Sequence, residues 1–215
     1  LNPDLVLASL TGTGNDKIVQ QLEAAGLEYI APEPVSLEDV FKNILQIASL
    51  LGNQTKGEQV VARMKEICSV ESEEDSLNIN EKPRILVEWW PKPVIAPGRF
   101  SWVSDMIGLA GGLNPLGEES HKSRPLDPSS QDLSIINKTD AVVIAWCGVP
   151  AEKYRPDIVY KREGWENSPA VKNRRVYMVP EAILGRPGPR LTSGLEALQA
   201  IVQELKELPV GDSVE

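Results

Sequence analysis

Histidine and cysteine are scarce in this chain, which limits the chemistry available to it. Its 215 residues include one histidine, His121, and two cysteines, Cys68 and Cys147, which lie far apart in segments of different kinds. They form no spacing typical of a metal site, so the ligands of a catalytic zinc or haem centre are missing. No nucleophile motif is recognisable either. We therefore expect no catalytic residues, no bound metal and no enzymatic cofactor.

Long apolar runs and an excess of positive charge are missing as well. No apolar run approaches the roughly 20 residues of a membrane-spanning helix. The formal net charge of −9 argues against nucleic acid and anionic lipid as partners. With 41% hydrophobic and 25% charged residues, the composition is that of a globular protein with one large core or two smaller ones.

Aromatic residues are few but concentrated in residues 88–102, E-W-W-P-K-P-V-I-A-P-G-R-F-S-W. This stretch holds three of the five tryptophans, and its three prolines and one glycine are expected to prevent regular structure. It follows a strand-like run at residues 84–87 and precedes a helix-like run at 101–110. The sequence therefore predicts a rigid aromatic loop at the end of a strand, whose rings either form a small core or contact a ligand.

Segments with the apolar pattern of strands alternate with segments patterned as helices. Strands are expected over residues 5–8, 29–31, 84–87, 141–146 and 176–179, and helices over 16–25, 37–51, 55–68, 101–110, 131–137 and 191–208. Residues 118–130 and 181–189 are expected to be loops. This order predicts an α/β fold of two lobes with mainly parallel sheets flanked by helices.

The helices between the two α/β regions allow two interpretations. They form either a long helical backbone that joins two lobes or two ordinary crossover helices. Under the first interpretation, residues 1–52 form an incomplete N-terminal lobe, 53–80 an inter-lobe helix with an acidic linker, and 81–215 the C-terminal lobe.

A short internal repeat supports two related lobes. Asp4 and Asp140 each precede an apolar strand that ends in alanine, and an acidic residue follows at the same offset, Asp16 in one case and Glu152 in the other. The second copy has a lead-in that begins near Arg84, and the first copy has none. We therefore expect that a strand, a loop and a helix precede Leu1 in the native protein.

The order of these motifs resembles that of class III periplasmic binding proteins, the cobalamin, siderophore and haem receptors of ABC importers. L-N-P-D-L-V-L-A, Q-Q-L-E-A-A-G-L-E and V-S-L-E-D-V resemble the first lobe, and residues 36 to about 75 resemble the inter-lobe helix. E-W-W-P-K-P-V-I-A-P-G-R-F-S-W-V-S-D-M-I-G-L-A-G-G-L-N is similar to the cobalamin-binding branch, and T-D-A-V-V-I-A-W and P-G-P-R-L also fit the second lobe. The family's first strand and its Ser/Thr-rich loop have no counterpart in this sequence.

This resemblance implies a monomeric, periplasmic or extracytoplasmic protein, with lipid anchoring left open. Its partners would be an ABC transporter permease and a small-molecule ligand, cobalamin or another corrinoid, with a ferric siderophore or haem as the alternative. Two other interpretations are an α/β enzyme that uses Glu88 or the turn Gly12-Thr13-Gly14, and a sensory or ligand-scavenging protein outside transport.

Ligand crevices in α/β sheets lie outside the carboxyl ends of the strands. The candidate ligand-binding residues are at such ends or in the family's ligand loops: Trp89, Trp90, Trp146, Phe100, Arg186 and Arg190. Aromatic rings suit a broad, mostly uncharged corrin plate, and the donors of Arg186 suit its amide or phosphate groups. The alternatives are that Trp90 or Trp102 fills the lobe core and that Arg190 ties down its loop.

The resemblance also implies one acidic residue per lobe for docking to arginines of the permease. Asp16 and Glu152 are the candidates, since both lie where a turn leads into a helix. Charges at such a rim set register and encounter rate more than affinity. The alternative is that these carboxylates only complement helix dipoles.

Overall fold

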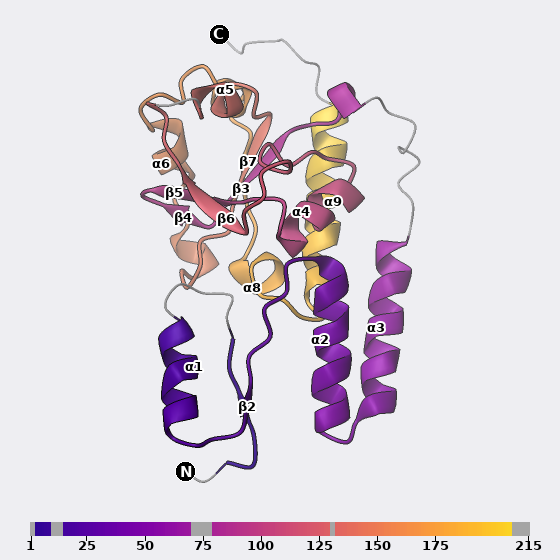
Figure 1. The fold of residues 1–215 in the computed structure, drawn as a ribbon. Coiled ribbons are helices and arrows are strands. Elements are labelled where there is room, and N and C mark those ends of the chain that lie inside the picture. The colour runs from indigo at the N-terminus through magenta and orange to yellow at the C-terminus, as the bar shows by residue number, and fades with distance from the viewer. Residues whose placement is uncertain (1–2, 10–14, 70–78, 130–131, 208–215) are drawn as a thin grey trace.

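A computed structural model describes residues 3–9, 15–69, 79–129 and 132–207 of the chain (Figure 1). A small N-terminal unit lies below a larger C-terminal body, and a pair of long helices stands beside the N-terminal unit and reaches the lower part of the C-terminal body (Figure 1). Parallel strands flanked by helices confirm the predicted α/β class.

The N-terminal unit is a strand, a helix and a strand, as predicted. β1 (Val6–Leu7) and β2 (Tyr29–Ile30) pair in parallel, with Val6 opposite Tyr29. α1 (Asn15–Ala24) lies between them in sequence and ends before Gly26, whose φ of +64° allows the chain to reverse.

Two helices follow as an antiparallel hairpin, α2 (Leu37–Leu50) and α3 (Gln54–Cys68). The Ser36 side chain caps α2 by accepting a hydrogen bond from the Asp39 amide at 3.1 Å. Their buried apolar residues, Leu37, Val40, Phe41, Val61 and Met64, share one core with the C-terminal lobe. The expected boundary after residue 52 falls in the turn between α2 and α3 and remains a prediction.

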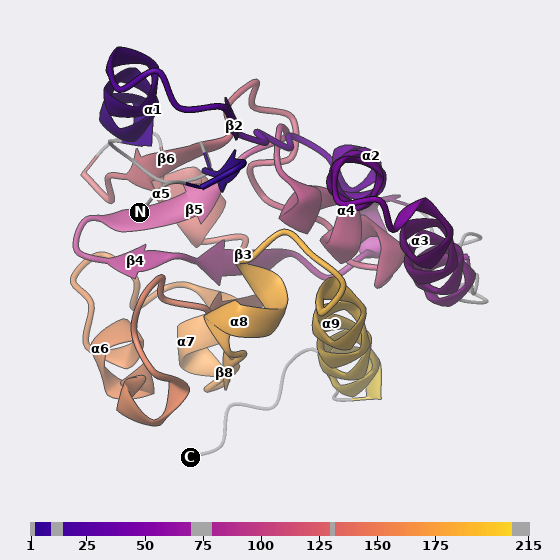
Figure 2. The ribbon, with the colours of Figure 1, turned by 90° about the horizontal axis from the view of Figure 1, so that it is seen from below.

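The central sheet of the C-terminal lobe consists of three parallel strands in the order β3-β7-β8. These are β3 (Ile85–Glu88), β7 (Ala141–Ile144) and β8 (Val176–Met178). Side chains alternate between the two faces of the sheet. Ile85, Val87 and Val143 pack with α4 (Trp102–Leu109) and α9 (Leu191–Glu207), whereas Val142 and Ile144 belong to the core on the other face. Figure 2 shows α4 and α9 gathered beside β3.

Short helical elements fill the connections of this lobe. They are η1 (Ile79–Glu81), α5 (Leu133–Ile136), η2 (Ala151–Lys153), α6 (Pro156–Tyr160), α7 (Pro169–Lys172) and α8 (Glu181–Leu184). α8 lies in the segment 181–189, which was expected to be a loop, so that expectation is wrong for its first four residues.

A second sheet contradicts the expectation that residues 88–102 and 118–130 lack regular structure. It is antiparallel, in the order β4-β5-β6, and its strands are β4 (Trp90–Pro91), β5 (Val94–Pro97) and β6 (Ser123–Leu126). The prolines are tolerated because Pro91 and Pro97 end their strands and Pro125 lies on an edge strand.

No helix within the described ranges is long and apolar enough to cross a membrane. This agrees with the absence of long apolar runs in the sequence.

Two helical glycines should respond oppositely to the same substitution. A Cβ at Gly194 of α9 would lie 2.1 Å from the Ile183 carbonyl oxygen, whereas a Cβ at Gly108 of α4 would have no neighbour within 4 Å. We expect Gly194→Ala to lower the free energy of unfolding by more than about 1 kcal/mol through overpacking. Gly108→Ala should raise it by roughly 0.5–1 kcal/mol because alanine favours the helix. Urea unfolding of both variants measures this, and a stabilised Gly194→Ala variant would contradict the close packing of α8 on α9.

Candidate functional site

The carboxyl ends of β3, β7 and β8 meet at one edge of the central sheet. We call this the carboxyl edge and define it by Trp89, Trp90, Trp146, Cys147 and Glu181. The backbone joins its members directly: the Cys147 amide donates to the Trp89 carbonyl at 3.0 Å. α8 lies at this edge next to α9 (Figures 1 and 2). The predicted tryptophans of β3 and β7 are therefore neighbours.

Trp90 presents the largest exposed ring at the carboxyl edge. Its side chain is 42% exposed, and it lies opposite Ile95 in the β4–β5 pair. Trp89 is half-buried, and its ring centre lies 6.1 Å from that of Trp102. Trp102 is a core residue, 5% exposed, and donates its indole N–H to the Leu184 carbonyl at 3.0 Å. Of the three, Trp90 has the most surface to offer a ligand.

Trp146 is buried in the core on the face of the central sheet that carries Leu86 and Val142. It is 4% exposed, and its indole Nε1 donates to Oε1 of Glu88 at 2.8 Å. The Tyr154 ring packs edge-on against it, with centroids 5.6 Å apart. Contact between Trp146 and a ligand remains a prediction, and the burial of the ring counts against it.

Glu88 is fully buried and is held by an arginine as well as by Trp146. Arg162 donates to its two carboxylate oxygens at 2.7 and 2.9 Å. The Arg162 guanidinium also stacks over Trp165, 4.5 Å from the ring centre. Because this carboxylate accepts from three donors and has no exposed surface, it is not placed to act as an acid or base.

The predicted arginines lie on the connection from α8 to α9. Arg186 Nε donates to Glu181 Oε2 at 2.8 Å, and the Arg186 side chain is 58% exposed. Arg190 Nε donates to the Ala182 carbonyl at 3.2 Å, which ties down the loop as the alternative interpretation expected. Phe100 is 43% exposed but lies after β5, where its amide donates to the His121 carbonyl at 3.1 Å.

Sequence reasoning missed Cys147, Tyr154 and Glu181. Cys147 is an exposed free cysteine, and desolvation raises the pKa of its thiol to about 11; the Glu181 carboxylate adds to this rise and Arg186 opposes it. The Tyr154 hydroxyl accepts a hydrogen bond from the Glu181 backbone amide at 3.1 Å. Burial raises the pKa of this Tyr154 hydroxyl. The position of Cys147 directly after Trp146 was the available signal.

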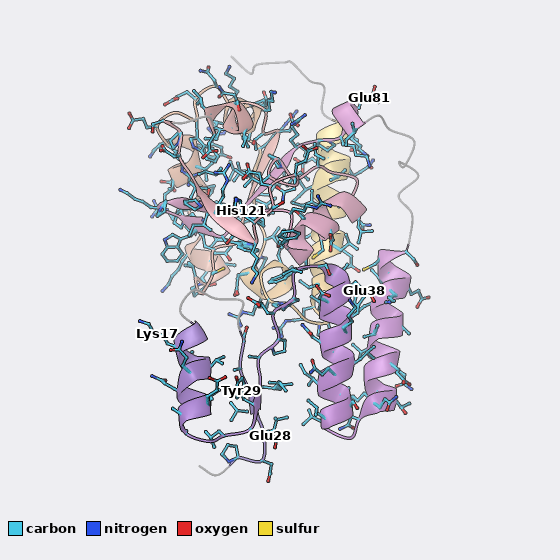
Figure 3. The ribbon with its side chains drawn as sticks, in the orientation of Figure 1. Lys17, Glu28, Tyr29, Glu38, Glu81 and His121 are labelled. Carbon is cyan, nitrogen blue, oxygen red and sulfur yellow. The ribbon has the colours of Figure 1, made fainter. Side chains whose placement is uncertain are left out.

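The remaining predicted residues are placed as follows. Glu152 is exposed on η2. Asp16 is the second residue of α1, and its side chain lies outside what the structure describes, as do residues 12–14. His121 is exposed on the C-terminal lobe, apart from Lys17 and Glu28 of the N-terminal unit (Figure 3). No three His, Cys, Asp or Glu side chains among the described residues could jointly hold a metal ion.

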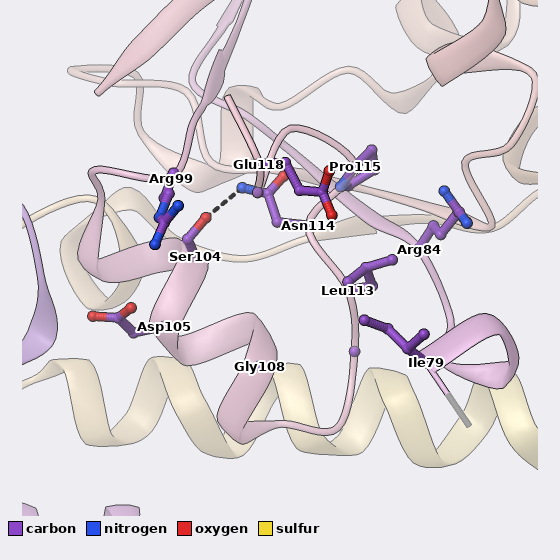
Figure 4. A pocket seen from close by; sticks show the side chains of 12 residues that line it. Ile79, Arg84, Arg99, Ser104, Asp105, Gly108, Leu113, Asn114, Pro115 and Glu118 are labelled. Atoms are coloured by element: carbon purple, nitrogen blue, oxygen red, sulfur yellow. Dashed lines mark hydrogen bonds between the residues drawn. The ribbon is translucent and has the colours of Figure 1, made fainter. Parts of the chain in front are cut away.

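A cavity of about 670 Å³ lies away from the carboxyl edge, beside α4 and Arg84 at the other end of β3 (Figure 4). Its lining carries Arg99, Asp105 and Glu118, and Asn114 donates to Ser104 across it at 2.5 Å. Burial raises the pKa of Asp105, whose carboxylate accepts from the Leu37 amide at 2.7 Å. This side chain caps α2 and so joins the helical hairpin to the C-terminal lobe.

A family model described as "Periplasmic binding protein" matches residues 1–183. The chain belongs to the periplasmic binding protein family. Among curated proteins it is similar to the uncharacterized ABC transporter substrate-binding lipoprotein YvrC of Bacillus subtilis, with 27% identity over 92% of this chain and 61% of that protein. It is also similar to the vitamin B12-binding protein of Vibrio parahaemolyticus, with 23% identity over 91% of this chain and 66% of that protein.

The same fold occurs in the apo form of the periplasmic heme-binding protein RhuT from Roseiflexus sp. RS-1. That structure is 24% identical, with a TM-score of 0.75 over 95% of this chain and 77% of the other. The chain spans between three fifths and two thirds of the length of its two curated relatives. These matches confirm the predicted family and its fold, and they support a binding protein over an enzyme.

The Glu88–Arg162 pair should be the main electrostatic support of this periplasmic binding protein's carboxyl edge. Arg162→Leu leaves a buried carboxylate with one donor, so we expect the free energy of unfolding to fall by about 3–5 kcal/mol. Arg155→Leu is the matched control: its pair with Asp157 is exposed, and its loss should change stability by less than about 1 kcal/mol. Adding Glu88→Gln to Arg162→Leu should restore part of the loss, and equal losses in the two single variants would contradict this account.

The Cys147 thiol should react slowly with alkylating reagents. At pH 8 a pKa of about 11 leaves a thiolate fraction about a hundredfold below that of a thiol at 9.0. In a Cys68→Ser background, iodoacetamide labelling followed by mass spectrometry should therefore accelerate about tenfold per pH unit up to pH 10. A rate that levels off between pH 9 and pH 10, as for a thiol with a pKa of 9.0, would show that the protein does not raise this pKa.

Proposed function

We propose that this protein captures a corrinoid, a cobalamin-like ligand, between two lobes and delivers it to an ABC importer. The observation that carries the proposal is Trp90, a tryptophan left 42% exposed at the carboxyl edge of a binding-protein fold. Removing such a ring from water is favourable by roughly 1.5–3 kcal/mol, and contact with a broad apolar ligand face would supply this free energy.

The relatives support this assignment at two levels. The B. subtilis relative is described as an ABC transporter substrate-binding lipoprotein, which favours a transport role outside the cytoplasm. The V. parahaemolyticus relative is described as a vitamin B12-binding protein, which favours a corrinoid.

We assign ligand contact first to Trp90 and the half-buried Trp89, with Phe100 at the rim. Trp146 remains a candidate contact, held in place by its bond to Glu88. Arg186 keeps N–H groups that can donate to the amide arms of a corrinoid, and Arg190 positions the loop that bears it. No residue of this site is assigned a catalytic role.

We further propose that the protein acts as a monomer and docks on the permease through one acidic residue per lobe. Glu152 is exposed on η2, as such a role requires, and Asp16 near the start of α1 is its counterpart. Carboxylates at these positions would pair with basic side chains of the permease and set the register of the complex.

Haem is the second candidate ligand, because the heme-binding protein RhuT shares the fold. A ferric siderophore is the third. Both alternatives keep the binding role and change only the chelate.

Calorimetric titration with cyanocobalamin, haemin and a ferric hydroxamate tests the proposal. We expect cyanocobalamin to bind, and Trp90→Ala to weaken binding about tenfold or more because burial of the ring is lost. Leu133→Ala is the control, since Leu133 is 39% exposed on α5, at the far end of the lobe (Figure 1). Binding of only an iron chelate would replace the corrinoid with that ligand, and failure of all three to bind would overturn the proposal.

A further inference from the structure

Each arginine that borders the carboxyl edge already has a protein partner within the described part of the chain. Arg162 pairs with Glu88, Arg186 pairs with Glu181, and the Arg190 Nε donates to a backbone carbonyl. Arg162 and Arg186 are thus already paired with carboxylates and are not open to hold a ligand carboxylate in a bidentate manner.

The pair between Glu181 and Arg186 is held by its surroundings. The Glu181 side chain is only 13% exposed. The backbone amide of Glu181 donates to the Tyr154 hydroxyl at 3.1 Å. Gly185 allows the loop to close over it, since a Cβ there would lie 2.9 Å from Cγ of Glu181. The carboxylate is therefore fixed beside Arg186 and is not a mobile surface charge.

Glu181 also lies close enough to Cys147 to act on its thiol. The thiol is uncharged at neutral pH because its pKa is about 11. Glu181, Arg186 and Cys147 together therefore carry no net charge. A neutral ligand finds hydrogen-bond donors and acceptors here. An anionic ligand is instead repelled by the Glu181 carboxylate, and Arg186 is already paired with that carboxylate.

We propose that Glu181 is a specificity-determining residue that makes this site select uncharged chelates and reject ligands bearing carboxylates. It occupies Arg186, so a ligand carboxylate would have to displace Glu181 or lie unpaired beside it. Discrimination then comes from repulsion of the wrong ligand as well as attraction of the right one. This inference rests on the proposed function and names the ligand class of the same site.

The test compares matched ligands. Cyanocobalamin and its separated monocarboxylic acid isomers, in which one propionamide is hydrolysed, differ by a single charge. We expect the wild-type protein to bind the amide at least about tenfold more tightly than at least one of the acids, the penalty of one unpaired charge. Haemin, with two propionates, should bind more weakly still.

Glu181→Gln keeps the backbone bond to Tyr154 and frees Arg186. It should remove most of the preference against that acid and strengthen haemin binding about tenfold. Asp157→Asn is the control, because it frees Arg155 from an exposed pair elsewhere on the same lobe and should alter none of these affinities. Circular dichroism verifies that both variants are folded, and the wild-type ligand comparison stands without them.

The outcomes separate this inference from the function on which it rests. Equal wild-type affinity for the amide and every acid, tighter binding of haemin than of cyanocobalamin, or a folded Glu181→Gln variant with unchanged selectivity would overturn the role of Glu181 alone. Failure of the wild-type protein to bind any of these chelates would overturn the proposed function.

Discussion

The buried carboxylate of Glu88 is the interaction on which the carboxyl edge depends. It ends β3 on the face that carries Leu86, so it lies within the core beside Val142 and Ile144 and has no access to water. A charge in that position is tolerable only when it is paired and fully hydrogen-bonded. Arg162 and Trp146 meet this requirement, which joins the ends of β3 and β7 to the segment after α6.

Side chains alternate between the two faces of the sheet along β3, so adjacent residues pack against different parts of the protein. Glu88 faces Arg162 and Trp165, whereas Trp89 turns to the opposite face, toward Trp102 and α9. Trp102 in turn bonds to the last carbonyl of α8, and Gly194 lets α9 approach that helix closely. The loop that carries Arg186 and Arg190 therefore rests on the core of the sheet face that carries Trp102 and Leu184.

Neutrality is the second physical property of the site. The chain carries a formal net charge of −9, and at the carboxyl edge Arg162 and Arg186 are each paired with a carboxylate, while Arg190 Nε donates to a backbone carbonyl. An engaged arginine orients a neutral partner through its remaining N–H groups without attracting an anion strongly. Exposed aromatic surface and compensated charge together favour a broad, uncharged ligand.

Periodicity and helix stop signals were sufficient to predict most of the fold. The apolar runs at β3, β7 and β8, the stripe along α9 and Gly26 at the end of α1 are local features, and each was found. The resemblance read from ordered motifs gave the family, which the family model confirmed. The β4–β5–β6 sheet is the main departure from the sequence-based expectation, because its prolines lie at strand ends and on an edge strand, where they do not break the pairing.

Only the tertiary structure decides which site residues are exposed and which are buried and hydrogen-bonded. Trp90 and Trp146 look alike in sequence, but one is exposed on a hairpin while the other is covered and bonded to Glu88. Along the chain, Arg162 lies 74 residues from its partner Glu88, and Trp146 lies 58 residues from the same glutamate. Local pattern reports which face of an element a residue occupies, whereas burial and pairing depend on what the rest of the chain places against that face.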